Sequence, residues 1–146
     1  MSGRKRHILT DTGGLLLKVK VHSAAIQDRD GAKLLLALAR LKLARLVVVW
    51  ADQSYRGDLA QWLWRYLGCL LQIVERSKDE GGHTRWGFVP LPKRWVVERT
   101  FAWFNLYRRL SKEYEYYPAS SEAMIYLASS HLLLQRLCRF TPPIHF

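Results

Sequence analysis

The chain has 146 residues, of which 49% are hydrophobic and 24% charged, a size and composition that suit one compact domain over residues 1–146. Its 23 lysines and arginines outnumber 12 acidic residues and give a formal net charge of +11, so we expect a polyanionic partner, with nucleic acid first. No apolar run is longer than that at residues 46–51, which is far shorter than the roughly 20 residues that cross a membrane. Two cysteines, Cys69 and Cys138, exclude a disulfide framework. We therefore expect a cytoplasmic protein without a membrane span.

The amino-terminal third of the chain predicts a β-hairpin followed by a helix. Residues 7–10 and 15–21 are β-rich runs, and the Asp-Thr-Gly-Gly stretch at 11–14 between them has the residue types that a tight turn favours. After a polar connection, Asp28 or Asp30 is expected to cap the amino end of a helix. The leucines of that helix recur at helical spacing, at positions 34, 35, 38 and 41.

The middle of the chain predicts two buried strands around a short helix. Residues 46–51 are apolar throughout and β-branched at their centre, which favours a strand buried on both faces that ends at Asp52. A short helix is expected over residues 59–67 and a second buried strand over residues 70–74. A loop containing glycines and prolines follows at residues 77–92.

The last third predicts two long helices. The first is expected from Arg94 to Leu110, with Glu98 on a narrow polar seam between two apolar flanks. The second is expected from Glu122 to Arg139, capped by Ser120 or Ser121. Together, the predicted elements indicate a mixed α/β fold with a short central sheet.

Two carboxylates stand out as candidate functional residues. Asp52 follows a predicted central strand, where open α/β sheets gather their ligands, although it also suits a turn or a helix cap. Glu98 lies among large apolar residues and is costly to bury unless it is paired or bound to metal. Arg94, one helical turn earlier, offers it an ordinary ion pair. Each residue alone therefore has a structural explanation as well as a functional one.

Five segments of the chain carry a family resemblance when they are taken together. The segments that carry it are residues 3–12, 27–32, 50–55, 94–103 and 107–112. With these segments the chain resembles the DDE transposases of bacterial insertion sequences, of the family four/five kind, over nearly all of its length. A single element, such as the Asp-x-x-Tyr at 52–55, is weak evidence, whereas the set is specific.

The resemblance implies a ribonuclease-H-like fold in which three carboxylates hold two divalent metal ions, usually Mg²⁺ with Mn²⁺ as a substitute. Asp52 matches the second catalytic Asp of the family, Glu98 matches its catalytic Glu, and Arg94 matches the arginine of its Tyr-Arg-Glu-Lys motif. Hard cations prefer such oxygen ligands, and a metal pair suits in-line phosphoryl transfer. The implied partners are transposon ends and target DNA.

The chain also departs from the family pattern. Leu91 stands at the motif's Tyr position and Asn105 at its Lys position, with Arg109 one turn further along. The first catalytic Asp, its central strand and the DNA-binding region of the family precede the segment that matches residues 3–7, so we expect them to be missing. Asp11 is the nearest acid and belongs to the predicted turn. We therefore expect weak or no nuclease activity from this chain alone, and a partner that is an upstream transposase fragment or another copy.

Basic and aromatic residues alternate in the segment that contains Glu98, a mixture that suits phosphate contacts beside packed aromatic rings. The same cations also suit a solvated face. The alternative to an enzyme is therefore a basic DNA-binding or oligomerising fragment that complements or inhibits a full-length transposase. The five histidines have no zinc-type spacing, and we treat them as structural or surface residues. The candidate DNA-binding residues are Arg4, Lys5, Arg6, Lys93, Arg99, Arg108, Arg109 and Lys112.

Overall fold

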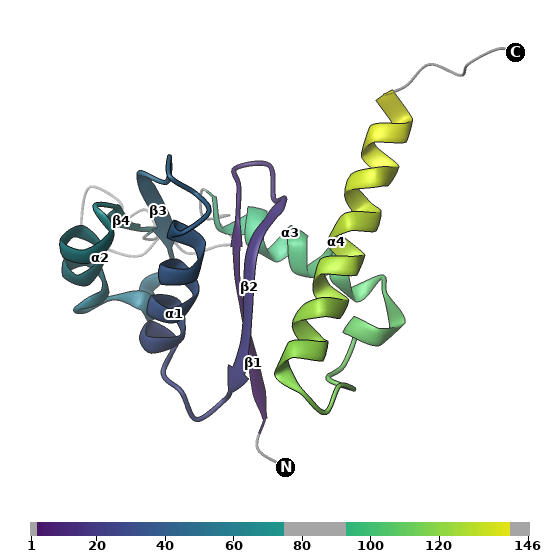
Figure 1. Cartoon of the computed structure of the whole chain (residues 1–146), viewed down its shortest axis with the longest axis horizontal. Coiled ribbons are helices and arrows are strands. Elements are labelled where there is room, and N and C mark those ends of the chain that lie inside the picture. Colours follow the sequence, from purple (N-terminus) through teal and green to yellow (C-terminus); the bar gives the residue numbers. More distant parts are fainter. Residues whose placement is uncertain (1–2, 75–92, 141–146) are drawn as a thin grey trace, which may run out of the picture.

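A computed structural model describes residues 3–74 and 93–140 of the chain. These residues form a mixed α/β structure that begins with a hairpin, as predicted (Figure 1). The predicted loop at 77–92, including Leu91, lies outside the described residues. In chain order the elements are β1 (Arg4–Thr10), β2 (Leu16–Ser23), α1 (Asp28–Arg40), β3 (Val48–Ala51), the 3-10 helix η1 (Gln53–Tyr55), α2 (Leu59–Leu67), β4 (Leu70–Ile73), α3 (Arg94–Asn105), the 3-10 helix η2 (Arg108–Leu110) and α4 (Pro118–Phe140).

The turn that connects the two strands of the hairpin is stabilised by hydrogen bonds to its own acidic residue, Asp11. Strands β1 and β2 pair antiparallel from Arg4 opposite Ser23 onward, with an irregularity at the end nearest the turn. In the turn, Oδ1 of Asp11 accepts hydrogen bonds from the backbone N–H groups of Gly13 at 2.9 Å and Leu15 at 2.8 Å. The Asp11 carboxylate therefore organises the turn, which is the role that its place between two strands predicts.

Strands β3 and β4 form a second, separate sheet. They pair in parallel, with Val48 opposite Leu70, and α2 connects them. The prediction that this strand is buried on both faces is wrong, because Val49 is 8% exposed whereas Trp50, on the opposite face, is 37% exposed. The prediction that the strand at residues 70–74 is buried is also wrong, because Leu70 in β4 (Leu70–Ile73) is 52% exposed. Helices α1 and α2 pack on the face that carries Val49, and the opposite face has far less cover.

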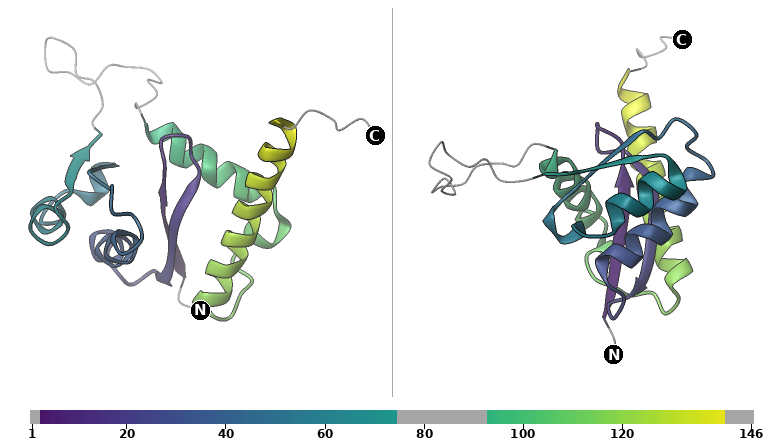
Figure 2. Two further views of the ribbon diagram at one scale, coloured as in Figure 1. Left: turned by 45° about the horizontal axis from the view of Figure 1, so that its top comes forward. Right: turned by 90° about the vertical axis from the view of Figure 1, so that its left-hand side faces the viewer.

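Two apolar cores lie on either side of the hairpin (Figures 1 and 2). One joins the hairpin to α3, η2 and α4, and the other joins α1, α2, β3 and β4. Figure 1 shows the hairpin between these two groups of elements. The buried members of the first core are Val19, Val21, Phe104, Leu110, Ile125 and Ala128, and those of the second are Ala32, Leu36, Val49, Leu59, Leu63 and Cys69.

The helix boundaries are partly as predicted. Helix α2 spans the predicted residues and ends at Gly68, whose φ of 63° gives the left-handed cap that glycine favours. Helix α3 ends at Asn105, so the prediction that it continues to Leu110 is wrong: Tyr107 has an extended backbone and η2 follows it. Helix α4 begins at Pro118, a residue well tolerated in a first helical turn, so the prediction that it starts at Glu122 with Ser120 or Ser121 as its cap is wrong. No helix within the described residues is long and apolar enough to cross a membrane.

Candidate functional site

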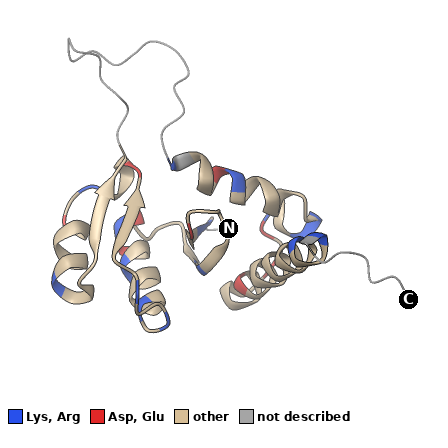
Figure 3. Ribbon diagram, turned by 90° about the horizontal axis from the view of Figure 1, so that it is seen from above, with Lys and Arg blue, Asp and Glu red and all other residues tan. Residues whose placement is uncertain are grey.

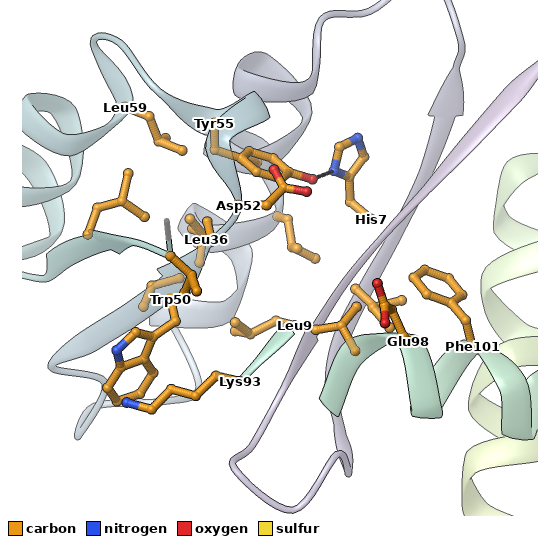
Figure 4. A pocket seen from close by; sticks show the side chains of 18 residues that line it. His7, Leu9, Leu36, Trp50, Asp52, Tyr55, Leu59, Lys93, Glu98 and Phe101 are labelled. Atoms are coloured by element: carbon orange, nitrogen blue, oxygen red, sulfur yellow. Dashed lines mark hydrogen bonds between the residues drawn. The ribbon is translucent and has the colours of Figure 1, made fainter. Parts of the chain in front are cut away.

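A pocket of about 320 Å³ lies between the hairpin and the β3–β4 sheet, with α1 and α3 also contributing to its walls (Figure 4). Most of its lining is apolar, and the polar groups are few. A pocket with an apolar lining and a few polar side chains is typical of binding sites. The polar and charged side chains that line it are His7, Asp52, Tyr55, Lys93 and Glu98.

Asp52 reaches this pocket because β3 ends there. It is half-buried and is the N-cap residue of η1, where its Oδ1 accepts a hydrogen bond from the backbone N–H of Ser54 at 2.9 Å. The backbone N–H of Tyr55 donates to the Asp52 carbonyl oxygen at 3.3 Å. The Asp52 carboxylate thus caps η1, which is the structural role that the sequence analysis offered for it, and it also lines the pocket. These two roles are compatible.

Glu98 reaches the same pocket from another element. It is exposed on α3, and its neighbours Val97 and Phe101 line the pocket with it. Figure 4 shows Asp52 and Glu98 on different sides of the pocket. Helix α3 begins at Arg94, whose side chain lies outside what the structure describes. The structure therefore places two of the three predicted site residues around one pocket, although 45 residues separate them in the sequence.

The donor set at the pocket does not make a complete metal site. Asp52 and Glu98 have the carboxylate oxygens that Mg²⁺ and Mn²⁺ prefer. Within residues 3–74 and 93–140, however, no group of three or more His, Cys, Asp or Glu side chains is arranged to hold a metal ion. Asp11 is committed to the hairpin turn. The described residues thus offer two carboxylates where the family resemblance implies three.

A hydrogen bond links the turn that carries Asp52 to strand β1. The hydroxyl group of Tyr55 lies 2.9 Å from Nδ1 of His7 (Figure 4). Burial, followed by the charges of Asp28 and Asp52, raises the pKa of Tyr55 to about 12, so the phenol keeps its proton at neutral pH. Burial, followed by the neighbouring His22, lowers the pKa of His7. Both partners of this hydrogen bond are therefore neutral near pH 7.

His7 belongs to a buried pair that the sequence interpretation missed as part of the site. Its ring stacks on that of His22 at 4.7 Å between centroids, and each residue is only 6% exposed. Asp28 Oδ1 lies 3.9 Å from Nε2 of His7 and 2.9 Å from Nζ of Lys5. The sequence interpretation ended the second strand at residue 21, whereas β2 continues to Ser23 and brings His22 onto the same face as Lys20, the residue opposite His7.

Some candidate DNA-binding residues have partners within the molecule, others are exposed, and Arg109 is both paired and exposed. Arg4, Lys5 and Arg6 have partners within the molecule: the guanidinium groups bond to backbone carbonyls between residues 110 and 116, and Lys5 pairs with Asp28. Arg99 donates to the Gly13 carbonyl oxygen, and Arg109 pairs with Glu115. Lysines and arginines lie on both halves of the molecule (Figure 3). The exposed members of the predicted set are Lys93, Arg108, Arg109 and Lys112.

Lys93 lies at the pocket itself. Its Nζ is 3.5 Å from the centre of the Trp50 ring, a cation–π contact between the residue before α3 and strand β3. Trp50 Nε1 donates to Oε1 of Gln72 at 2.6 Å, which fixes the ring on the sheet. The pocket that Asp52 and Glu98 line is therefore also lined by a positive side chain, which is held over the Trp50 ring (Figure 4).

Comparison with known proteins adds independent information. The family model described as "Transposase DDE domain" matches residues 1–133. A protein from Burkholderia cepacia named "Putative transposase for insertion sequence element IS402" is 32% identical over 121 residues, which are 77% of this chain and 54% of that relative. The chain thus spans about half the length of this curated relative. No solved structure gives a significant match.

Proposed function

Since this chain belongs to the DDE transposases of insertion sequences, we propose that it is the catalytic part of such an enzyme and that Asp52 and Glu98 are the acids required for DNA strand cleavage and transfer. The observation that carries this proposal is that both carboxylates line one pocket, although they come from different elements. Arg94, at the start of α3, is proposed as an electrostatic partner or a DNA contact.

The proposed substrate is DNA, at transposon ends and at the target. A net charge of +11 favours a polyanion, and phosphate contacts position a duplex without reading its sequence. Lys93 is proposed as a phosphate contact, because it lines the same pocket as the two acids and is exposed. Arg108 and Lys112, which follow the end of α3 and are exposed, are proposed as further phosphate contacts.

Transposases of this family generally use divalent metal ions. The two carboxylates present are suitable oxygen donors, but they do not complete a three-acid site within the described residues. We therefore assign no reaction step to a metal in this chain. The third acid of the proposed enzyme would come from a segment outside the described residues.

The pocket suggests where such a segment would bind. In the described part of the chain, β1 has only β2 as its strand neighbour and β3 has only β4. The pocket lies between β1 and β3 and is lined by Leu9, Val49 and other apolar side chains. An added strand here would satisfy two open edges and join both sheets into one, as the ribonuclease-H-like fold requires. The greater length of the relative from Burkholderia cepacia is consistent with further chain in the whole protein.

The test is cleavage of DNA that carries the insertion-sequence ends, by the longer transposase that contains this chain. We expect Asp52→Asn and Glu98→Gln each to reduce cleavage by more than about 100-fold while DNA binding stays within about two-fold. Asp30→Asn is the matched control, because Asp30 is an exposed acid on α1 away from the pocket lining. Normal cleavage by both site variants would overturn the proposal.

A second candidate function is a basic DNA-binding or oligomerising fragment without catalysis. The incomplete acid set within the described residues favours it. Its signature is DNA binding that weakens steeply with salt but is unaffected by Mg²⁺ or by Asp52→Asn. A cleavage activity that requires Asp52 would exclude it.

A further inference from the structure

We propose that the β1–β2 hairpin is the frame that holds both carboxylates, with Thr100 as the positioning residue for Glu98 and His7, acting through Tyr55, as the positioning residue for Asp52. This inference rests on the proposed function, because it assigns roles around the same two acids. It concerns residues that the catalytic proposal does not use.

The first link joins the hairpin turn to α3. The Thr100 hydroxyl is 1% exposed and lies 2.8 Å from the carbonyl oxygen of Gly14 and 3.0 Å from that of Val96, so its single proton is shared between them. Arg99 Nη2 donates to the carbonyl oxygen of Gly13 at 2.7 Å. Two consecutive residues of α3 are thus bonded to two consecutive residues of the turn, and Glu98 is the residue immediately before them.

The turn is built for this close approach. Gly14 has a φ of 83°, and a Cβ atom placed on it would lie 3.0 Å from Oγ1 of Thr100. A side chain at this position would therefore be strained and would crowd the hydroxyl. The Asp11 carboxylate stiffens the turn by accepting two backbone hydrogen bonds. The Gly14 carbonyl is consequently a fixed anchor for α3.

The stacking around Arg99 strengthens the first link. Its guanidinium carbon lies 4.4 Å from the centre of the Trp95 ring and 4.8 Å from that of Trp103, both on α3. These contacts hold the guanidinium in the orientation that reaches Gly13. Arg99, which the sequence suggests as a DNA contact, is in this account part of the link between α3 and the turn.

The second link joins the hairpin to the turn that carries Asp52. His7 lies at the centre of β1. Its Nδ1 is hydrogen-bonded to the hydroxyl group of Tyr55, the last residue of η1. The backbone of Tyr55 is itself bonded to that of Asp52. A displacement of Tyr55 would therefore be transmitted to Asp52 through a single turn of backbone.

His7 cannot easily swing away from Tyr55. It is stacked on His22, whose Nδ1 must donate to the Ser23 carbonyl oxygen at 2.9 Å, because a carbonyl can only accept. Helix α1 packs against the Nε2 atoms of both rings: a Cβ atom on Gly31 would lie 2.3 Å from Nε2 of His22 and 2.9 Å from Nε2 of His7. The absence of a side chain at Gly31 allows the helix to pack directly on the two rings.

The two links share one frame, which is why the inference concerns both acids together. Asp52 follows a strand that does not pair with the hairpin, and Glu98 lies on a helix that is far from β3 in the sequence. Within the described residues, Tyr55–His7 and Thr100–Gly14 are direct side-chain hydrogen bonds between these elements and the hairpin. Figure 4 shows the Tyr55–His7 link and Glu98 around the same pocket.

The test uses this chain itself and needs no activity. Backbone order parameters would be measured by NMR relaxation for Thr100→Val, Tyr55→Phe and the conservative Thr100→Ser. We expect the order parameter at Glu98 to fall from about 0.85 toward 0.6 in Thr100→Val, and that at Asp52 to fall similarly in Tyr55→Phe. Thr100→Ser keeps the hydroxyl and should match the wild type. Unchanged order parameters in folded Thr100→Val and Tyr55→Phe would overturn the inference.

A kinetic arm separates this inference from the proposed function. In the cleavage assay, Thr100→Val and Tyr55→Phe should each lower kcat by at least about ten-fold without changing KM for DNA, and Thr100→Ser should restore the rate. If Asp52→Asn and Glu98→Gln abolish cleavage while Thr100→Val and Tyr55→Phe leave kcat unchanged, the positioning roles are wrong and the proposed function stands. If Asp52→Asn and Glu98→Gln cleave normally, the proposed function fails.

Discussion

The two sides of the hairpin are packed very differently. Toward α4, Val19 and Val21 are at most 1% exposed and meet Ile125, which is equally buried. Toward β3, residues of β1 line a pocket of about 320 Å³. An apolar pocket with a few polar side chains is typical of a binding site, whereas the side toward α4 is filled by buried side chains. The closed side gives the hairpin its stability, and the open side is where the two candidate acids lie.

The largest expected effect tests the closed side. Ile125→Ala should lower the free energy of unfolding by about 2–5 kcal/mol, because it removes a fully buried side chain and leaves a cavity. Leu9→Ala on the pocket wall should cost about 1 kcal/mol or less, since Leu9 is only partly buried and already borders open space. Urea denaturation of both variants measures the contrast. Equal losses would show that the two sides are packed alike.

The junction of α4 with the hairpin gives a smaller effect. Oε1 of Glu122 accepts a hydrogen bond from the backbone N–H of Val21 at 2.9 Å and lies 2.9 Å from Nζ of Lys20. Glu122→Ala leaves a buried N–H group without its partner and should lower the free energy of unfolding by about 1–3 kcal/mol. Asp58→Ala, which removes an exposed ion pair with Lys33, is the control and should have a smaller effect.

Acidification should lower the free energy of unfolding through His7, on the side of the hairpin that faces the pocket. The pKa of His7 is lowered from 6.5 by burial and by His22, so the unfolded chain binds more protons than the folded one just below neutral pH. The stability that this residue provides is complete above about pH 7 and is lost as the pH falls through 6.5 toward the lowered value. His7→Gln should flatten this part of the stability profile, as followed by thermal unfolding between pH 5 and 7. An unchanged slope would contradict the assigned environment of His7.

The smallest effect concerns the cations on the two sides. Lys93→Ala, beside the pocket, should reduce the salt dependence of DNA binding by about one unit of the logarithmic slope. Arg6→Ala should leave that slope unchanged, because the Arg6 guanidinium is bonded to Glu113 and to the Leu110 carbonyl oxygen on the closed side. Fluorescence anisotropy over a range of salt concentrations distinguishes the two. A larger change in slope for Arg6→Ala would reverse the assignment.

Local pattern was sufficient to predict the elements that depend on neighbouring residues. The turn residues at 11–14 predicted the hairpin, and helix α2 spans the predicted residues because apolar spacing and Gly68 define it locally. The break after Asn105 was not predictable in this way. Tyr107 leaves the helical conformation, and its hydroxyl lies 2.7 Å from Nδ1 of His131, a residue of α4 distant in the sequence.

The two acidic residues of the candidate site could be predicted one by one from their sequence neighbours. Asp52 was singled out because it follows an apolar strand, and Glu98 because it lies among large apolar side chains. Their shared pocket depends on tertiary packing and was implied only by the family resemblance. Thr100 and His7 were not predicted as positioning residues, because sequence spacing does not reveal their contacts with Gly14 and Tyr55.

If Asp52 and Glu98 act at one centre, as we propose, a double-mutant cycle will reveal the coupling between them. The rate of strand cleavage would be measured for Asp52→Asn, for Glu98→Gln and for the double variant in the transposase that contains this chain. Residues that act as a unit are strongly non-additive. We predict that the double variant is no slower than the slower single variant. Losses that multiply in the double variant would show that the two acids act independently and would contradict the account.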